Sequence, residues 1–169
     1  MPLYQPMAME LETRRLALRP WTEADAEDYS ALTAERDSRV LSVAAARERI
    51  AAHLASAEQI GIALLTVRRR AEGDFIGYCG LIVGRASVDE PEIAYELFRR
   101  VHGHGYATEA AASVVQAAAA TGRKRLWSTV GSWNAPSLRV LDKLGFHRDH
   151  VDPDRGGRGE VVWLTRTLP

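Results

Sequence analysis

The sequence is poor in cysteine, because Cys79 is the only one among its 169 residues. A single cysteine excludes a disulfide within the chain and a metal cluster built from cysteines. Cys79 lies in the apolar run 75–83, where a thiol serves more often as a small buried hydrophobe than as a nucleophile. We therefore expect Cys79 to belong to the core.

An excess of either charge is also missing, because 22 Lys and Arg residues balance 22 Asp and Glu residues. This balance excludes general electrostatic binding to nucleic acid or to an acidic membrane. No apolar run is long enough to cross a bilayer, and the first residues lack the charged and apolar regions of a signal peptide. We expect a cytoplasmic protein with no nucleic-acid partner and no membrane partner.

The composition is that of a globular protein, with 46% hydrophobic and 26% charged residues. A length of 169 residues predicts a single domain, 1–169, that can bury a sizeable core. Residues 1–10 carry two prolines and no hydrophobic period. We expect this segment to form a loose tail.

Hydrophobic periodicity predicts the element order β-α-α-β-β-β-α-β-α-β-β. This order is typical of an α+β or α/β domain with a mixed sheet. The first strand is expected at the sheet edge, because a proline ends it. The predicted strands are 14–19, 62–67, 75–83, 92–98, 125–130, 146–151 and 160–167, and the predicted helices are 22–33, 44–57, 110–120 and one that begins at 134.

A glycine-punctuated turn, the glycine loop (residues 100–107), joins a predicted strand to a predicted helix. Gly103 and Gly105 allow a tight turn and leave room for a close ligand. The first N–H groups of the following helix lack helical partners, so they suit a phosphate or diphosphate. The run is not a P-loop, and Thr108 breaks the G-x-G-x-x-G dinucleotide pattern. The alternative is an ordinary connection whose glycines only make the turn.

Two motifs carry a resemblance to a known family. Arg100, Gly103 and Gly105 fill the pattern Q/R-x-x-G-x-G/A, and the run G-Y-A-T-E-A continues from it. A second motif, N-x-x-S-x-x-x-x-x-K-x-G-F, begins at Asn134. With both motifs in order, the sequence resembles the GNAT superfamily of acyl-CoA-dependent N-acetyltransferases. The match is closest to the ribosomal-protein N-terminal (alanine/serine) acetyltransferase branch.

The resemblance implies a three-layer GNAT-like fold, with a mixed, mostly antiparallel sheet of about seven strands flanked by about four helices. It also implies that the sheet splays between the Glu92 strand and the Arg125 strand. Acetyl-CoA is then the co-substrate, with its pantetheine arm along the Glu92 strand and its pyrophosphate on the glycine loop. The implied donor-binding residues are Leu97, Phe98, Arg99, Arg100, His102, Gly103, His104, Gly105, Tyr106, Ala107, Asn134 and Lys143. No metal is expected, because the histidine pairs lack further ligands at recognised spacing.

Acetyl transfer to an amine requires a proton acceptor for the amine and a proton donor for the leaving thiolate. Glu92 and Glu96 lie four apart on one face of the predicted strand. The resemblance makes Glu92 our first candidate for the base or water holder, while Glu96 could line the acceptor site. Ser137 matches the position of the acid in this branch. The alternatives are a solvated strand residue for each carboxylate and a first-turn helix hydroxyl for Ser137.

The resulting hypothesis is transfer of an acetyl group from acetyl-CoA to a primary amine by direct attack. The acceptor is a protein N-terminus or a small-molecule amine, and we expect segments 30–46, 84–90 and 149–158 to determine the choice. A catalytically silent acyl-CoA-binding or sensing module is the alternative. The protein is expected to be a monomer or a homodimer.

Overall fold

The computed structural model describes residues 3–36 and 39–169. These residues form one eight-stranded sheet with the strand order β1-β2-β3-β4-β5-β6-β8-β7. Neighbouring strands are antiparallel except for β5 and β6, which run parallel. The strands are β1 (Leu11–Glu12), β2 (Leu16–Arg19), β3 (Leu64–Arg69), β4 (Phe75–Ile82), β5 (Glu92–Leu97), β6 (Arg125–Gly131), β7 (His147–Asp152) and β8 (Val161–Thr167).

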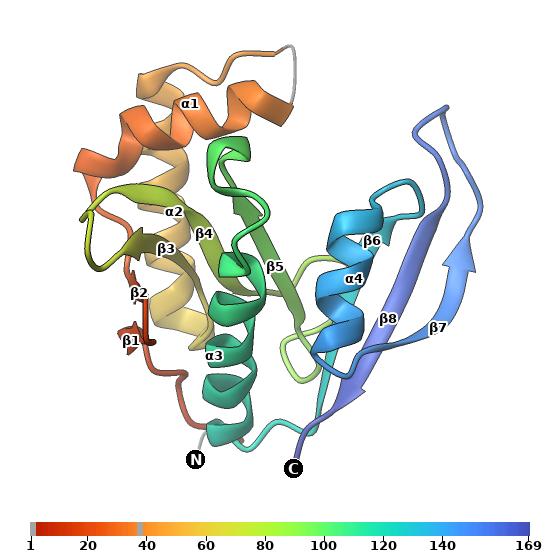
Figure 1. Cartoon of the computed structure of the whole chain (residues 1–169). Helices are drawn as coiled ribbons and strands as arrows, with labels where there is room; N and C mark the ends of the chain where they lie inside the picture. The colour runs from red at the N-terminus through yellow and green to blue at the C-terminus, as the bar shows by residue number, and fades with distance from the viewer. Residues whose placement is uncertain (1–2, 37–38) are drawn as a thin grey trace.

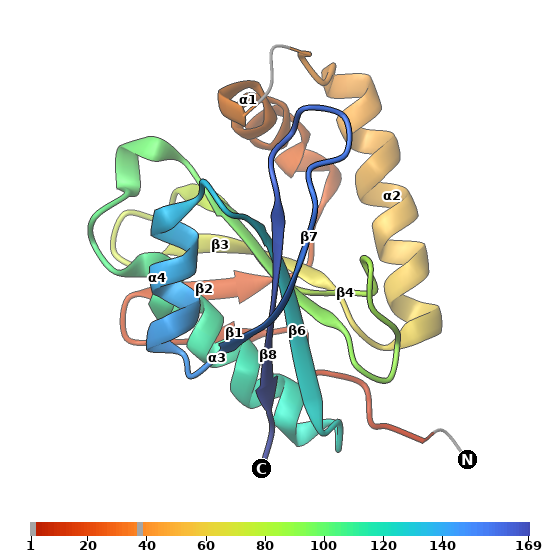
Figure 2. The ribbon, with the colours of Figure 1, turned by 90° about the vertical axis from the view of Figure 1, so that its right-hand side faces the viewer.

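Helices cover both faces of the sheet, so the expected three layers are confirmed. Figures 1 and 2 show α1 and α2 on one face and α3 and α4 on the other. The α-helices are α1 (Ala26–Arg36), α2 (Val43–Ile60), α3 (Tyr106–Ala120) and α4 (Ala135–Lys143), and the short 3-10 turns are η1 (Glu23–Asp25) and η2 (Arg99–Val101). The buried apolar side chains form one core that includes Cys79, as expected.

An additional strand and an earlier helix start distinguish the structure from the sequence prediction. β1 pairs with β2 outside the predicted first strand, so β2 is not the sheet edge. The helix predicted over 110–120 begins at Tyr106, directly after Gly105, whose φ of 79° places it in the left-handed region. The alanine-rich pattern alone could not show that the helix starts inside the glycine loop.

The sequence predicts a loose tail over residues 1–10, and this prediction is wrong from Gln5 onward. Met7 is 3% exposed, and its N–H donates to the Gly61 carbonyl oxygen at 2.9 Å. The Gln5 N–H donates to the Thr121 carbonyl oxygen at 3.0 Å. The tail therefore packs against the C-terminal ends of α2 and α3, where carbonyl groups need donors. Residues 1–2 lie outside the described part of the chain.

The sheet opens between β5 and β6. The two strands share one register pair, Glu92 with Trp127, and then diverge (Figure 1). The Phe98 N–H donates to the Ile76 carbonyl oxygen on β4. Because backbone groups alternate along a strand, those of Tyr95 and Leu97 point to the other side, toward the opening. The expected splay is confirmed, and it leaves a stretch of β5 edge facing open space.

Candidate functional site

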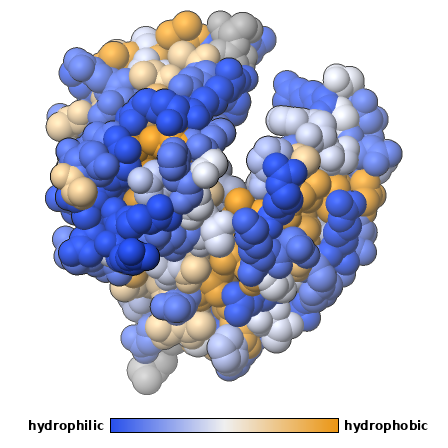
Figure 3. Space-filling view, in the orientation of Figure 1, coloured by the Kyte–Doolittle hydropathy of each residue, from blue (hydrophilic) through white to orange (hydrophobic). Residues whose placement is uncertain are grey.

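A cavity of about 640 Å³ follows the opening between β5 and β6. Figure 3 shows the molecular surface hollowed between the part built on β5 and the part that carries α4. The wall combines α1, β5, η2, the glycine loop with the first turn of α3, and α4 along its whole length. The lining residues are Leu32, Glu35, Arg36, Tyr95, Glu96, Leu97, Arg99, Val101, His102, Gly103, Gly105, Tyr106, Ala107, Thr108, Trp133, Asn134, Pro136, Ser137, Arg139, Val140 and Lys143.

The structure brings most of the predicted donor-binding residues to this wall, but not all of them. Phe98, Arg100 and His104 lie outside it, as does the predicted base Glu92. Of the three segments expected to choose the acceptor, only 30–46 contributes, through α1. Residues 37–38 of that segment lie outside the described residues.

The glycine loop forms an anion-binding geometry at one end of the cavity. Gly103 and Gly105 have φ values of 82° and 79°, as their type at a tight turn predicts. The first helical bond of α3 runs from the Glu109 N–H to the Gly105 carbonyl oxygen. The N–H groups of Tyr106 to Thr108 therefore have no partner within the helix, and all three residues line the cavity. This end suits a phosphate or diphosphate.

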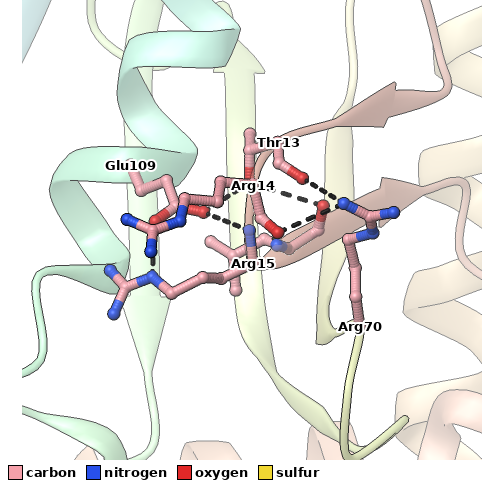
Figure 4. A network of polar contacts seen from close by, with 6 residues as sticks. Thr13, Arg14, Arg15, Arg70 and Glu109 are labelled. Carbon is pink, nitrogen blue, oxygen red and sulfur yellow. Dashed lines mark hydrogen bonds and ion pairs between the residues drawn. The ribbon is translucent and has the colours of Figure 1, made fainter.

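A polar network braces the start of α3 (Figure 4). Glu109 accepts hydrogen bonds from the Thr13 hydroxyl at 2.5 Å, from the Arg15 backbone N–H at 2.9 Å and from the Arg15 side chain at 2.7 Å. Burial alone would raise the pKa of Glu109, but these donors hold it below its ordinary value. Arg70 in turn donates to the carbonyl oxygens of Thr13 and Arg14. The network ties the first residues of the domain to the glycine loop.

Arg100 is directed toward β4. Its guanidinium contacts the Asp74 carboxylate at 3.0 Å and the Phe75 carbonyl oxygen at 3.1 Å, and it lies over the Phe98 ring. Asp74 also accepts two hydrogen bonds from Arg69, both at 2.8 Å. The bonds from Arg69 first, and then from Arg100, lower the pKa of Asp74 to about 2. The expected contact of Arg100 with a phosphate therefore stays a prediction.

Two backbone groups at the free end of the β5 edge are hydrogen-bonded to side chains. The Leu97 carbonyl oxygen contacts His102 Nε2 at 3.0 Å. The Arg99 N–H donates to Glu35 Oε2 at 2.9 Å, and the Arg99 guanidinium donates to the Glu35 carbonyl oxygen at 2.7 Å. The C-terminal turn of α1 is thereby fixed against the cavity wall.

A pair of hydroxyl groups lies where α4 meets β5. The Asn134 side chain accepts a hydrogen bond from the Ser137 N–H at 3.3 Å, so Asn134 caps α4. The Tyr95 hydroxyl lies 2.9 Å from Ser137 Oγ and 3.1 Å from the Ser137 carbonyl oxygen. Burial raises the pKa of Tyr95 to about 12, so its hydroxyl stays protonated. Sequence reasoning missed Tyr95. Its position one residue before Glu96 places it on the strand face opposite the two candidate carboxylates, and this alternation was the signal that could have directed attention to it.

The two candidate carboxylates have different surroundings. Glu92 is 4% exposed, and both of its oxygens accept hydrogen bonds, one from the Thr129 hydroxyl at 2.6 Å and one from the Arg85 N–H. Glu96 lines the cavity, and burial raises its pKa. Its Oε2 contacts Arg36 at 3.4 Å, whereas its Oε1 is buried with no hydrogen-bond partner. Of the two carboxylates, only Glu96 belongs to the cavity wall.

Within the described residues there is neither a metal-binding cluster nor a membrane-spanning helix. No three His, Cys, Asp or Glu side chains within residues 3–36 and 39–169 gather in a way that could hold a metal ion. Within the same residues, the longest apolar helical stretch falls short of what a bilayer crossing requires.

Comparison with known families identifies the domain. Residues 15–147 match the family model described as an acetyltransferase (GNAT) domain. The matched range includes both motifs and ends at His147, the first residue of β7. Among curated proteins, no sequence matches.

Solved structures share the fold over nearly the whole chain. An acetyltransferase from Agrobacterium tumefaciens is 25% identical with a TM-score of 0.73, and the match covers 98% of each chain. The ribosomal-protein-S5-alanine acetyltransferase from Vibrio fischeri is 15% identical with a TM-score of 0.79, covering 95% of this chain and 97% of that one. The microcin C7 self-immunity acetyltransferase MccE, solved with acetyl-CoA and AMP, is 16% identical with a TM-score of 0.79, covering 92% and 94%.

Proposed function

Since this chain belongs to the GNAT acetyltransferase family, we propose that it transfers an acetyl group from acetyl-CoA to a primary amine. One observation carries the proposal: the helix N-terminus at Tyr106 and the free edge of β5 open into the same cavity. The first suits a diphosphate and the second suits a chain of amides. A donor that contains both groups in sequence fits this arrangement.

The donor's pyrophosphate would lie on the N–H groups of Tyr106 to Thr108. Arg139 and Lys143 line the same cavity from α4 and supply positive charge. The pantetheine amides would pair with the backbone of Tyr95 and Leu97 as an added strand. His102 and Glu35 hold neighbouring edge groups in the free protein, so donor binding would displace these side chains from the Leu97 carbonyl and the Arg99 N–H.

We assign the base to Glu96. Glu92, our first candidate from the sequence, has both oxygens engaged and lies outside the cavity wall. Its contact with Thr129 on β6 suits a residue that fixes β5 to β6 where the strands part. Glu96 faces the cavity, and the raised pKa of its carboxyl suits it to accept a proton from an amine.

Ser137 would be the acid, with Tyr95 as the group that positions it and relays a proton back to it. One proton of the ammonium passes to Glu96, and the nitrogen then bonds to the acetyl carbon. The carbon–sulfur bond breaks, and the thiolate takes a proton from the Ser137 hydroxyl. The second proton leaves the nitrogen and returns to the Ser137 oxygen through the Tyr95–Ser137 hydroxyl pair, and Glu96 releases the first proton to solvent. The Cys79 thiol is 0% exposed, so the proposal includes no covalent enzyme intermediate.

Calorimetric titration with acetyl-CoA tests the donor site. The wild type should bind, and Gly103→Glu should not, because a negative side chain would occupy the anion site. Circular dichroism controls for folding. If neither acetyl-CoA nor CoA binds to the wild type, the proposal fails.

Turnover with a panel of primary amines tests the reaction. Glu96→Gln should reduce kcat and remove the acidic limb of the pH profile, whereas Glu92→Gln should keep that limb. Donor binding with no turnover of any amine would support the silent acyl-CoA-binding module instead.

A further inference from the structure

A weak ion pair joins α1 to β5 in the cavity wall. Arg36 and Glu96 meet through one contact of 3.4 Å. Elsewhere in the molecule, Arg69 and Asp74 meet through two contacts of 2.8 Å. The Arg36–Glu96 pair therefore uses little of the hydrogen-bonding capacity of either group.

Both members of the pair line the cavity, and both have unused hydrogen-bonding capacity. Glu96 Oε1 is buried without a donor, which is costly for a carboxylate oxygen unless a ligand supplies one. The Arg36 side chain is 53% exposed, and a guanidinium carries five N–H donors arranged to match a carboxylate. A ligand with a cationic donor and a neighbouring carboxylate would satisfy both.

The charges around the pair are balanced. The cavity wall from α1, β5 and η2 carries two carboxylates and two guanidiniums, from Glu35, Glu96, Arg36 and Arg99. Their formal sum is zero. A polyamine would leave the two arginines facing added positive charge, and a polyanion would leave the two glutamates facing added negative charge. A dipolar ligand of zero net charge meets neither penalty.

We propose that the acceptor is a free α-amino acid, with its α-amino group against Glu96 and its α-carboxylate on Arg36. This inference rests on the proposed function and names the substrate class for the same site. The α-amino group then lies at the residue assigned as the base. Trp133, which is 72% exposed, lines the same cavity and offers apolar surface to the acceptor's side chain.

The matched substrates are L-leucine, L-phenylalanine and L-alanine. Each is compared with its α-amide and with the dipeptide in which it is N-terminal and glycine is C-terminal. Acetylation is followed by CoA release at saturating acetyl-CoA. We expect kcat/KM for the free acids to exceed that for the amides by at least 100-fold. Equal rates for acids and amides, or a preference for the dipeptides, would overturn the proposal and favour a protein N-terminus or a simple amine.

The matched variants are Arg36→Gln and Arg47→Gln. Arg36→Gln should lower kcat/KM for the free acids about 10- to 100-fold, mainly through KM, and should change the value for the amides far less, through the pKa of Glu96. Arg47 is an exposed residue of α2 outside the cavity wall, so its variant should match the wild type. An equal loss for acids and amides in Arg36→Gln would refute carboxylate recognition.

Calorimetry with acetyl-CoA separates the two levels of the proposal. If acetyl-CoA binds and an amine without a carboxylate is the preferred acceptor, the amino-acid proposal fails while the proposed function stands. If acetyl-CoA does not bind, both fail.

Discussion

The substitution Gly103→Ala tests the anion site with the smallest possible change. Gly103 has φ of 82°, and a Cβ added there would meet no atom within 4 Å. The substitution therefore introduces backbone strain without a clash inside the protein. An alanine in the left-handed region costs about 1–2 kcal/mol. For a chain of this length the melting temperature should fall by roughly 2–8 °C.

The effect on the donor should be larger than the strain. The added methyl group would hold the phosphates away from the loop N–H groups. Losing one hydrogen bond to a charged group costs about 1.5–3 kcal/mol, so acetyl-CoA affinity should fall about 10- to 100-fold.

Gly122→Ala is the matched control. Gly122 has φ of 90° and equally open space around its added Cβ, but it follows the C-terminal end of α3, away from the cavity. Both variants should melt at similar temperatures, and only Gly103→Ala should bind acetyl-CoA weakly in calorimetry. Unchanged affinity in Gly103→Ala would refute the reasoning that the phosphates approach this backbone.

Three further expectations concern the surroundings of the site. Asp74→Asn should lower the free energy of unfolding by about 1–2 kcal/mol at pH 7, after allowance for solvent screening. In urea titrations this deficit should close as the pH falls from about 4 toward 2, because the lowered pKa of Asp74 gives stability only while the carboxyl is ionised. Thr129→Val should destabilise by about 1–3 kcal/mol in the same assay, since it removes a donor from buried Glu92, whereas Thr129→Ser should restore most of the loss. The Cys79 thiol should react with a thiol reagent only after denaturation, because it is fully buried and burial raises its pKa.

Local chemistry made part of this site predictable. The positive φ of Gly103 and Gly105 follows from residue type at a tight turn, and the Asn134 cap follows from its place before a helical pattern. Two-residue periodicity correctly predicts that Glu92 and Glu96 share a strand face. The order of elements from β2 onward and the sheet opening are likewise confirmed, because they follow from strong patterns and a family resemblance.

Long-range partners decide what the sequence alone could not. Glu92 accepts a hydrogen bond from Thr129, which lies 37 residues away along the chain, and no local sequence pattern predicts that contact. Glu109 is likewise held by Thr13 and Arg15, more than ninety residues before it. The packed N-terminal segment was missed for the same reason, since its partners are carbonyl groups at two distant helix ends.

The opening between β5 and β6 links the binding of the donor to the thermal stability of the protein. The sheet is interrupted after the single register pair at Glu92, and under the proposed function the donor takes the place of the missing strand. A ligand that binds only the folded state adds about 2.7 kcal/mol of stability at a concentration 100 times its Kd. For a chain of this size that corresponds to roughly 5–11 °C in melting temperature. The folded lifetime of this protein would then vary with the supply of acetyl-CoA around it, so its abundance would follow the level of the metabolite that it consumes.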